Sequence, residues 1–408
     1  MDILPDIESV LIPLPDWEMR IETRRFGPFT FRLGVDGAAL AVLYQRVLDA
    51  HERFSASPLS QVARQLEREV VVSSIFGTNS IEGGALTEEE TQSALDLDPA
   101  QVMDEEQLRA VNLKAAYGLA QQAAVTPDWR LDMSFIRAVH AAITRRLAHP
   151  YNQPGAFRDN PKSIKTYVGN QNHGGQYQPP QHGHDIETLI QALVDWQRGL
   201  EERGVPALIR APLVHYYFEL IHPFWDGNGR VGRVLEATLL QAAGFQYAPF
   251  ALAGYYLKHI DEYFILFNRC RKAAKNKMDN PQTDFVRFHL EGMRVVINQL
   301  HDRVNRIVGL LLFESHIRQL YDEKTLNDRQ YTIISQLMAS GKPLSLMEMR
   351  RMPWYQSLYL KLKDKTKQRD LRHLRDLKLV VVDGQDRLWP GCVAIKALSE
   401  KTPKEGTN

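Results

Sequence analysis

The chain has 408 residues, of which 44% are hydrophobic and 24% are charged, and its formal net charge is +1. This composition is typical of an ordinary globular protein with room for two or three domains. The near-neutral charge gives no global indication of nucleic-acid or membrane binding, and no run of about 18 apolar residues predicts a membrane-spanning helix.

The N-terminus and the cysteines both favour a cytoplasmic protein. The chain begins Met-Asp-Ile-Leu-Pro-Asp, which is acidic and lacks the hydrophobic core of a signal peptide. Cys270 and Cys392 are the only cysteines and lie far apart in the sequence. We predict that both are reduced packing residues and belong neither to a disulfide framework nor to a zinc site.

The first informative segment in chain order follows an amphipathic helix. Apolar residues recur at helical spacing through residues 62–70, and Gly77 is expected to interrupt this helix. The next six residues read Thr-Asn-Ser-Ile-Glu-Gly. From residue types alone, Thr78 is predicted to cap a helix, Glu82 to be a surface carboxylate and Gly83 to end a helix.

Residues 151–184 are too rich in Gly, Pro and Asn for a helix. Within them Tyr167 and Val168 favour a short extended strand, so the segment is predicted to be a surface loop that contains a hairpin. The three histidines of this segment, His173, His182 and His184, do not have a recognised metal-binding spacing.

Residues 222–233 read His-Pro-Phe-Trp-Asp-Gly-Asn-Gly-Arg-Val-Gly-Arg. Apolar residues at helical spacing precede this stretch and follow it, so it is predicted to be a loop between two helices, with Gly-Asn-Gly at the start of the second helix. Glycines let backbone N–H groups converge on a ligand, and a helix N-terminus attracts anions. The stretch therefore favours phosphate binding.

The charged side chains of this stretch fit the same chemistry. Arg230 and Arg233 are three residues apart, which places them side by side on a helix and suits a di- or triphosphate. Asp226 is suited to hold Mg²⁺ beside phosphate oxygens. His222 is expected to end the first helix and to accept a proton from an incoming hydroxyl. Taken singly, these residues are more often a helix end, a turn and solvated arginines; the order in which they occur favours a site.

The stretch resembles the signature of the Fic family, HPFx(D/E)GNGRxxR, at every specified position. The resemblance implies a mainly α fold, a helical Fic core with a short β-hairpin flap, that transfers AMP from ATP to a hydroxyl side chain of a target protein or of itself. His222 would be the base and Asp226 the Mg²⁺ ligand. Arg233 would reach the γ-phosphate. The implied nucleotide-binding residues are Gly227, Asn228, Gly229, Arg230, Val231, Gly232, Arg233 and Tyr263.

The resemblance extends to two other segments. Thr78, Glu82 and Gly83 match the inhibitory motif (S/T)xxxE(G/N) of the family, in which Glu82 would pair with Arg233 and restrain it. Glu82 could equally position a water that removes AMP from a modified target. By the same resemblance, the flap residues Tyr167, Val168 and Gly169 would pair with the backbone of the target.

Aromatic residues downstream of the signature have two readings. Tyr255, Tyr256, Tyr263 and Phe264 are expected either to form a surface for adenine or to belong to the core. Residues 290–311 carry apolar side chains at alternating spacings of three and four, which predicts a long helix packed on the core, with a dimeric coiled coil as the alternative.

The C-terminal region concentrates positive charge. Residues 342–378 contain eleven Lys or Arg against four Asp or Glu. A basic helix is predicted at 366–374, with Leu371 and Leu374 on its buried side, followed at 379–389 by two strands around an Asp-Gly turn. The order resembles a winged helix-turn-helix, which binds DNA or serves protein contacts and dimerisation.

The domain organisation predicted from these segments has four parts. They are an N-terminal helical region with the inhibitory segment (1–110), the Fic core (111–285), a connecting helix (286–325) and a winged-helix-like domain (326–408). The function expected first is an auto-inhibited protein adenylyltransferase. A bifunctional or deAMPylating enzyme and a Fic-containing DNA-binding regulator are the alternatives.

Overall fold

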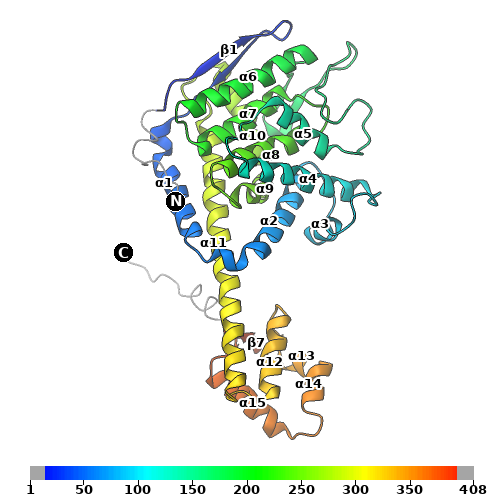
Figure 1. The fold of residues 1–408 in the computed structure, drawn as a ribbon, viewed down its shortest axis with the longest axis vertical. Coiled ribbons are helices and arrows are strands. Elements are labelled where there is room, and N and C mark those ends of the chain that lie inside the picture. Colours follow the sequence, from blue (N-terminus) through cyan, green and yellow to red (C-terminus); the bar gives the residue numbers. More distant parts are fainter. Residues whose placement is uncertain (1–13, 393–408) are drawn as a thin grey trace. The chain divides into compact units, whose positions relative to one another are not determined.

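The computed structural model describes residues 14–392, and they form a mainly helical fold (Figure 1). The chain divides into two compact units, Met1–Asp302 and Arg303–Asn408. The acidic start at residues 1–6 lies outside the described residues. The predicted boundary between residues 110 and 111 falls inside a helix, Glu105–Val125, so the polypeptide does not divide there.

The elements of the first unit are, in chain order, β1 (Glu18–Glu22), β2 (Pro28–Arg32), α1 (Gly37–Ser55), α2 (Leu59–Ile81), α3 (Glu88–Leu95), α4 (Glu105–Val125), α5 (Met133–Ile143), β3 (Val168–Asn170), η2 (Gln171–His173), β4 (Gly175–Tyr177), α6 (Gly183–Glu202), α7 (Ala207–Ile221), α8 (Asn228–Ala242), α9 (Ala248–Lys258), α10 (Ile260–Lys275) and the first part of α11 (Thr283–Asp322).

Helices α7 and α8 form the centre of this unit. Helix α7 is buried along nearly its whole length and packs on α6 and α8, while α8 also contacts α4 and α5. A helix that is apolar on all sides needs neighbours on all sides, which explains why α7 lies inside the unit. The loop between α7 and α8 is therefore held between two buried helices.

Helix α2 differs from its prediction at two residues. Gly77 does not interrupt it, and Thr78 is a fully buried residue within the helix instead of an N-cap. A Cβ at residue 77 would lie 3.0 Å from the backbone of Ala253, so glycine here allows α2 to pack closely on α9. The helix ends with Glu82 as its C-cap, and Gly83 adopts a positive φ of 84°.

Two antiparallel hairpins complete the first unit. The predicted flap contains β3 and β4, which pair through Val168 with Tyr177 and Asn170 with Gly175. Tyr167 comes just before β3 and is exposed. The hairpin of β1 and β2 was not predicted, although Met19, Ile21, Phe29 and Phe31 alternate with polar or small residues in a strand-like pattern.

Helix α11 is the predicted long helix. The side chains of Leu290, Met293, Ile297 and Leu300 are buried within the chain, as expected for packing on the core. Leu311, at the end of the apolar pattern, is 46% exposed. Among the described residues, no helix is both long enough and apolar enough to cross a membrane. Cys270 is buried and Cys392 is partly buried, and neither is part of a disulfide within the described residues.

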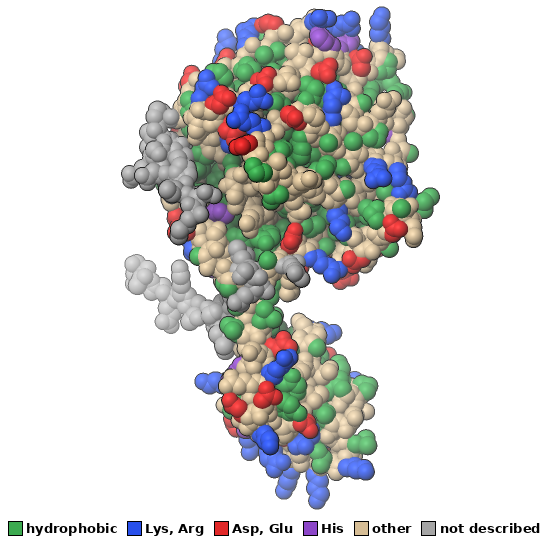
Figure 2. Space-filling model, in the orientation of Figure 1, with side chains coloured by type: hydrophobic (Ala, Val, Ile, Leu, Met, Phe, Trp, Pro, Cys, Tyr) green, Lys and Arg blue, Asp and Glu red, His purple; other side chains and the backbone are tan. Residues whose placement is uncertain are grey.

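The second unit has its own core and a three-stranded sheet. After α11 come α12 (Asp328–Ala339), β5 (Leu344–Ser345), α13 (Leu346–Arg351), α14 (Pro353–Leu358), α15 (Asp364–Asp376), β6 (Val380–Val382) and β7 (Arg387–Pro390), with the sheet order β5-β7-β6. The predicted basic helix and hairpin are thus present, and Leu374 is fully buried. Lys and Arg side chains gather along one end of this unit (Figure 2).

Candidate functional site

The loop between α7 and α8 is fixed by its own backbone and by one amide side chain. His222 ends α7 in a left-handed conformation with φ 49°, and Gly227 begins α8 with φ 80°. The Asn228 side chain accepts a hydrogen bond from the N–H of Phe224 and donates one to its carbonyl oxygen, at 2.9 and 2.8 Å. Asn228 therefore closes the turn, and the free N–H groups that begin α8 lie beside it.

His222 has a buried carboxylate beside its ring. Its Nδ1 lies 3.4 Å from Oε2 of Glu219, one turn earlier on α7. Burial opposes ionisation of Glu219, but His222, His215 and Arg233 hold the pKa of that carboxyl below its usual value. An ionised Glu219 favours the tautomer with the proton on Nδ1, which leaves the Nε2 lone pair free to accept a proton.

Arg230 and Asp226 form an ion pair within the loop. Nη2 of Arg230 donates to Oδ2 of Asp226 at 2.8 Å, and the guanidinium is 2% exposed. The pKa of Asp226 is lowered although burial opposes it, because Arg230 and the N–H of Gly227 stabilise the carboxylate. The buried Nε and Nη1 of Arg230 have no hydrogen-bond partner among the described residues.

Arg233, one turn further along α8, is bound to the end of α2. Its Nη2 donates to Glu82 at 2.5 Å and to the carbonyl oxygen of Thr78 at 3.3 Å, and its Nη1 donates to the hydroxyl of Tyr263. Burial opposes the charge of Arg233, yet Tyr263 and Glu82 raise its pKa above the ordinary value. A Cβ at Gly229 would overlap the Glu82 carboxylate, so Glu82 occupies the space against the first turn of α8.

A buried polar chain continues from Arg233 into the core. The hydroxyl of Tyr263 lies 3.0 Å from Nε2 of His215, whose Nδ1 is 2.9 Å from Glu236. Glu236 also accepts a hydrogen bond from Tyr256 and pairs with His289 at 2.8 Å. Burial opposes the charge of Glu236, but the two histidines lower its pKa, so it is a buried anion in this network.

His222, Glu219, Arg233, Glu82 and Tyr263 border a cavity of roughly 260 Å³. Its lining joins the end of α2, the flap, α7, α8 and α10, and consists of Glu82, Val168, Gly169, Asn170, His173, Tyr177, Glu219, His222, Gly229, Arg233, Tyr263, Phe264, Phe267 and Asn268. His222, Glu82 and Arg233 therefore face one space, although Glu82 and Arg233 are 151 residues apart in the sequence.

Other predicted residues lie outside the lining of this cavity. Val231 is fully buried in the core, and a Cβ at Gly232 would lie 2.7 Å from the His215 ring, so Gly232 serves packing. Tyr255 and Tyr256 pack on Phe288 of α11; Tyr256 is buried in the core, whereas Tyr255 is only partly buried. The further predicted residues outside it are Asp226, Gly227, Asn228, Arg230, Tyr167, Thr78 and Gly83.

Two buried residues that sequence reasoning missed support the loop from outside. The fully buried Arg158 donates from Nε to the carbonyl oxygen of His222 at 2.7 Å. His140 stacks on Phe224 at 3.6 Å, and its Nδ1 accepts from Gly155 while Nε2 faces the carbonyl oxygen of Asp226. Burial lowers the pKa of His140 to about 4, so its ring is neutral. Glu219 was not predicted either. Of these three residues, it alone lies close in sequence to a predicted site residue, three positions before His222.

The carboxylates of the site do not form a metal cage. Within residues 14–392, no group of three or more His, Cys, Asp or Glu side chains could hold a metal ion. Asp226 is a single ionised carboxylate beside an arginine with two unpartnered nitrogens. That donor set fits Mg²⁺ if most of the remaining ligands are phosphate oxygens and water.

The chain is similar in sequence to known proteins of one family. The model of the Fic/DOC family matches residues 130–240. The chain is 29% identical over 192 residues to a protein adenylyltransferase Fic of Drosophila ananassae, covering 46% of this chain and 35% of that protein. It is 27% identical over 190 residues to a probable protein adenylyltransferase of Aquifex aeolicus, covering 43% and 55%. The matched region thus covers between about a third and somewhat more than half of the length of these relatives.

Solved structures share the fold. A Fic family protein from Desulfovibrio desulfuricans superimposes with a TM-score of 0.54 at 18% identity, covering 91% of this chain and 97% of that one. Residues 134–508 of Fic-1 from C. elegans give a TM-score of 0.52 at 21% identity, covering 66% and 73%. At these identities the likeness concerns the fold alone.

Proposed function

Because residues 130–240 match the model of the Fic/DOC family, we propose that this protein is a protein adenylyltransferase, which transfers AMP from ATP to a Ser, Thr or Tyr hydroxyl of a target protein or of itself. The main support for the proposal is that His222, the first turn of α8 and Arg233 all line one cavity. The cavity combines a proton acceptor with a cationic site for phosphates.

The reaction is an in-line displacement at the α-phosphorus. Nε2 of His222 takes the proton of the target hydroxyl while the oxygen bonds to phosphorus, and the bond to the bridging oxygen breaks to release pyrophosphate. Arg230 and Arg233 stabilise the phosphate charge together with the N–H groups that begin α8. Asp226 would hold Mg²⁺, which would supply positive charge that stabilises the phosphates. Tyr263 supports Arg233 through its hydroxyl.

Glu82 restrains this reaction. Its carboxylate holds Arg233 and occupies the space beside Gly229, where a phosphate would need to lie. Thr78 adds its carbonyl oxygen to the same guanidinium, and Gly83 allows the chain to turn away after Glu82. ATP then binds weakly or in a pose that does not react. An alternative that uses the same geometry is a deAMPylating or bifunctional enzyme, in which Glu82 positions a water for hydrolysis.

The flap completes the site on the side of the target. Val168 and Gly169 border the cavity, and β3 pairs with β4 alone among the described strands. An extended segment of the target can add to this hairpin by backbone hydrogen bonding, which brings a hydroxyl near His222 without demanding a particular sequence. Tyr167, exposed just before β3, would contact the same segment.

Transfer is tested by intact mass in the Glu82→Gly protein incubated with ATP and Mg²⁺. We expect a gain of AMP, and we expect His222→Ala in the same background to lower its rate roughly 100-fold or more while ATP binding is retained. An equal rate in both proteins would rule out His222 as the base. Absence of label in both, with ATP, GTP, UTP or CTP, would contradict the transferase.

The second unit supports a second candidate function, DNA binding. Its order of helices and strands resembles that of a winged helix-turn-helix, and Lys365, Arg369 and Arg372 are exposed on one face of α15. Full-length protein is expected to bind duplex DNA with an affinity that falls steeply with salt, and Glu at these three residues is expected to abolish binding. If the intact protein does not bind at low salt, the unit serves protein contacts instead.

A further inference from the structure

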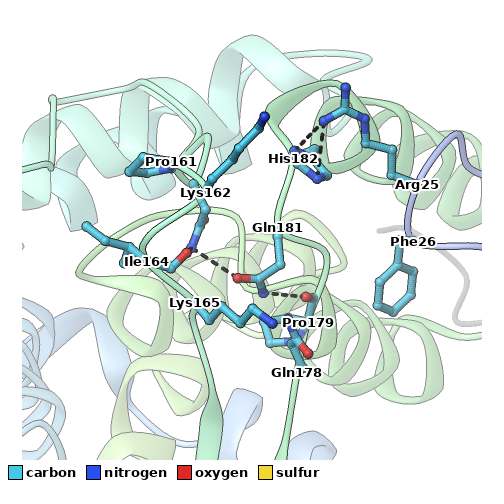
Figure 3. A pocket seen from close by; sticks show the side chains of 11 residues that line it. Arg25, Phe26, Pro161, Lys162, Ile164, Lys165, Gln178, Pro179, Gln181 and His182 are labelled. Carbon is cyan, nitrogen blue, oxygen red and sulfur yellow. Dashed lines mark hydrogen bonds between the residues drawn. The ribbon is translucent and has the colours of Figure 1, made fainter.

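A second cavity, of roughly 520 Å³, lies where the flap joins the helical core (Figure 3). Two of its walls are the chain segments that lead into β3 and out of β4, and the third is the turn between β1 and β2. Its lining is Arg25, Phe26, Asn160, Pro161, Lys162, Ile164, Lys165, Gln178, Pro179, Gln181 and His182, none of which borders the cavity at His222.

This cavity carries uncompensated positive charge. Arg25, Lys162 and Lys165 line it together with His182, and its lining contains no carboxylate. None of the three cations has an ion pair with another described residue, and Nη1 of Arg25 lies 3.3 and 3.4 Å from the ring nitrogens of His182. Asp159 approaches His182 to 4.0 Å but accepts the N–H of Gly183 and does not line the cavity.

The walls are fixed by hydrogen bonds of two polar side chains, Gln181 and Asp185. Gln181 accepts hydrogen bonds from the N–H of Thr166 and from Asn160, and its own amide donates to the carbonyl oxygens of Thr166 and Pro179. On the opposite wall the buried carboxylate of Asp185 accepts three backbone N–H groups from residues 24–26. The positions from which the cations project are therefore set by the fold before any ligand binds.

One buried side chain joins this cavity to the loop at His222. Arg158 donates to the carbonyl oxygen of His222 and also to the carbonyl oxygen of Pro180 and to Oδ1 of Asn160, at 2.6 and 2.7 Å. The floor of the basic cavity and the backbone of the reacting histidine thus share one rigid guanidinium. A ligand bound in the cavity would therefore have a fixed position relative to His222.

We propose that this basic cavity binds acidic side chains of the protein target, on the segment of the target next to the strand that pairs with the flap. The proposal rests on the proposed transfer reaction and adds a specificity for acidic sequence. A strand advances about 3.3 Å per residue, so a peptide on the flap passes the cavity within a few residues. Phe26 and Ile164 provide apolar surface for the stems of Glu side chains.

Binding is tested with a fluorescent peptide that carries a tyrosine followed by eight glutamates, and with the same peptide carrying eight glutamines. The full-length Glu82→Gly protein is compared with its Lys162→Glu/Lys165→Glu form. The matched control is Lys258→Glu/Lys275→Glu, which changes the charge equally at exposed lysines outside the cavity. Thermal melting and ATP affinity of each protein monitor its fold.

We expect the acidic peptide to bind with a salt-dependent affinity that falls about tenfold or more in the cavity variant and less than about twofold in the control. The glutamine peptide should bind weakly to all three proteins. Equal loss in both variants, equal binding of the two peptides, or displacement of the peptide by an equimolar single-stranded DNA would overturn the proposal.

The transfer reaction gives a separate result. If the tyrosine of the acidic peptide is modified, its KM is expected to rise about tenfold in the cavity variant, in step with the affinity. Binding of the acidic peptide without any modification would leave the acidic site standing and contradict the transferase. Modification without any preference for the acidic peptide would leave the transferase standing and contradict the acidic site.

Discussion

Arg230 and Arg233 lie one turn apart on α8, both are buried, and each is paired with a carboxylate of different origin. The partner of Arg230 is Asp226, four residues earlier in the same loop, whereas the partner of Arg233 is Glu82, 151 residues earlier at the end of α2. The first pair forms whenever the loop folds. The second depends on the packing of α2 and can be lost without any change in the loop.

This difference separates what builds the site from what restrains it. The Asp226 pair belongs to the phosphate- and metal-binding part of the proposed site, so its loss should lower activity. The Glu82 pair occupies an arginine that the substrate needs, so its loss should raise activity. Loss of these two ion pairs, which have similar chemistry, is therefore predicted to have opposite effects on activity. Substitutions at each pair test this difference.

Of the two ion pairs, the larger effect on the rate is expected at Asp226. Asp226→Asn keeps the size of the side chain but removes the charge that would hold Mg²⁺ and that pairs with Arg230. In the Glu82→Gly protein we expect the rate of AMP transfer to fall roughly 100-fold, measured by intact mass over time. Asp195→Asn, an exposed carboxylate on α6, is the control and should change little. A normal rate in Asp226→Asn would show that the local pair has no part in catalysis.

A smaller effect, on stability, is expected at Asn228. Asn228→Ala removes two hydrogen bonds to the buried backbone of Phe224, so the free energy of unfolding should fall by about 1 to 3 kcal/mol in urea titrations. Gln241→Ala, which removes one exposed hydrogen bond near the end of α8, should cost less than about 0.5 kcal/mol. Equal costs would mean that the loop is not held by Asn228.

An effect on stability of similar size is expected from pH. Burial lowers the pKa of His140 to about 4, below the unfolded value of about 6.5, so the unfolded chain binds the extra proton first as the pH falls. The contribution of His140 is fully present above about pH 6.5 and is lost between there and about pH 4. His140→Gln should reduce the decrease in the free energy of unfolding over this pH range by about 1 to 3 kcal/mol. If the decrease is unchanged in this variant, other groups cause it.

The difference between local contacts and contacts across the chain also explains how much of the fold and the site could be predicted from the sequence. His222 at the end of one helix, the start of the next at Asn228 and the hairpin within 379–389 depend on neighbouring residues, and the structure has all three. Gly77 was expected to break a helix because glycine usually does so. The close contact with Ala253 that makes it useful there is not visible in local sequence.

The contacts that link distant segments could not be predicted from composition or spacing. Arg158 and His140 read as ordinary residues, yet they hold the carbonyl oxygens of His222 and Asp226 from outside the loop. Tyr263 was identified through family resemblance, whereas its hydrogen bonds to Arg233 and His215 required the fold. The basic cavity is assembled from three segments and had no signature of its own.

The most direct test of the account compares the wild-type protein with Glu82→Gly, incubated with ATP and Mg²⁺ and followed by intact mass. We predict that the substitution raises the rate of AMP incorporation about tenfold or more, and that it has no such effect when Arg233 is already alanine, because the carboxylate acts through that arginine. Equal rates in wild type and Glu82→Gly would contradict the restraint by Glu82.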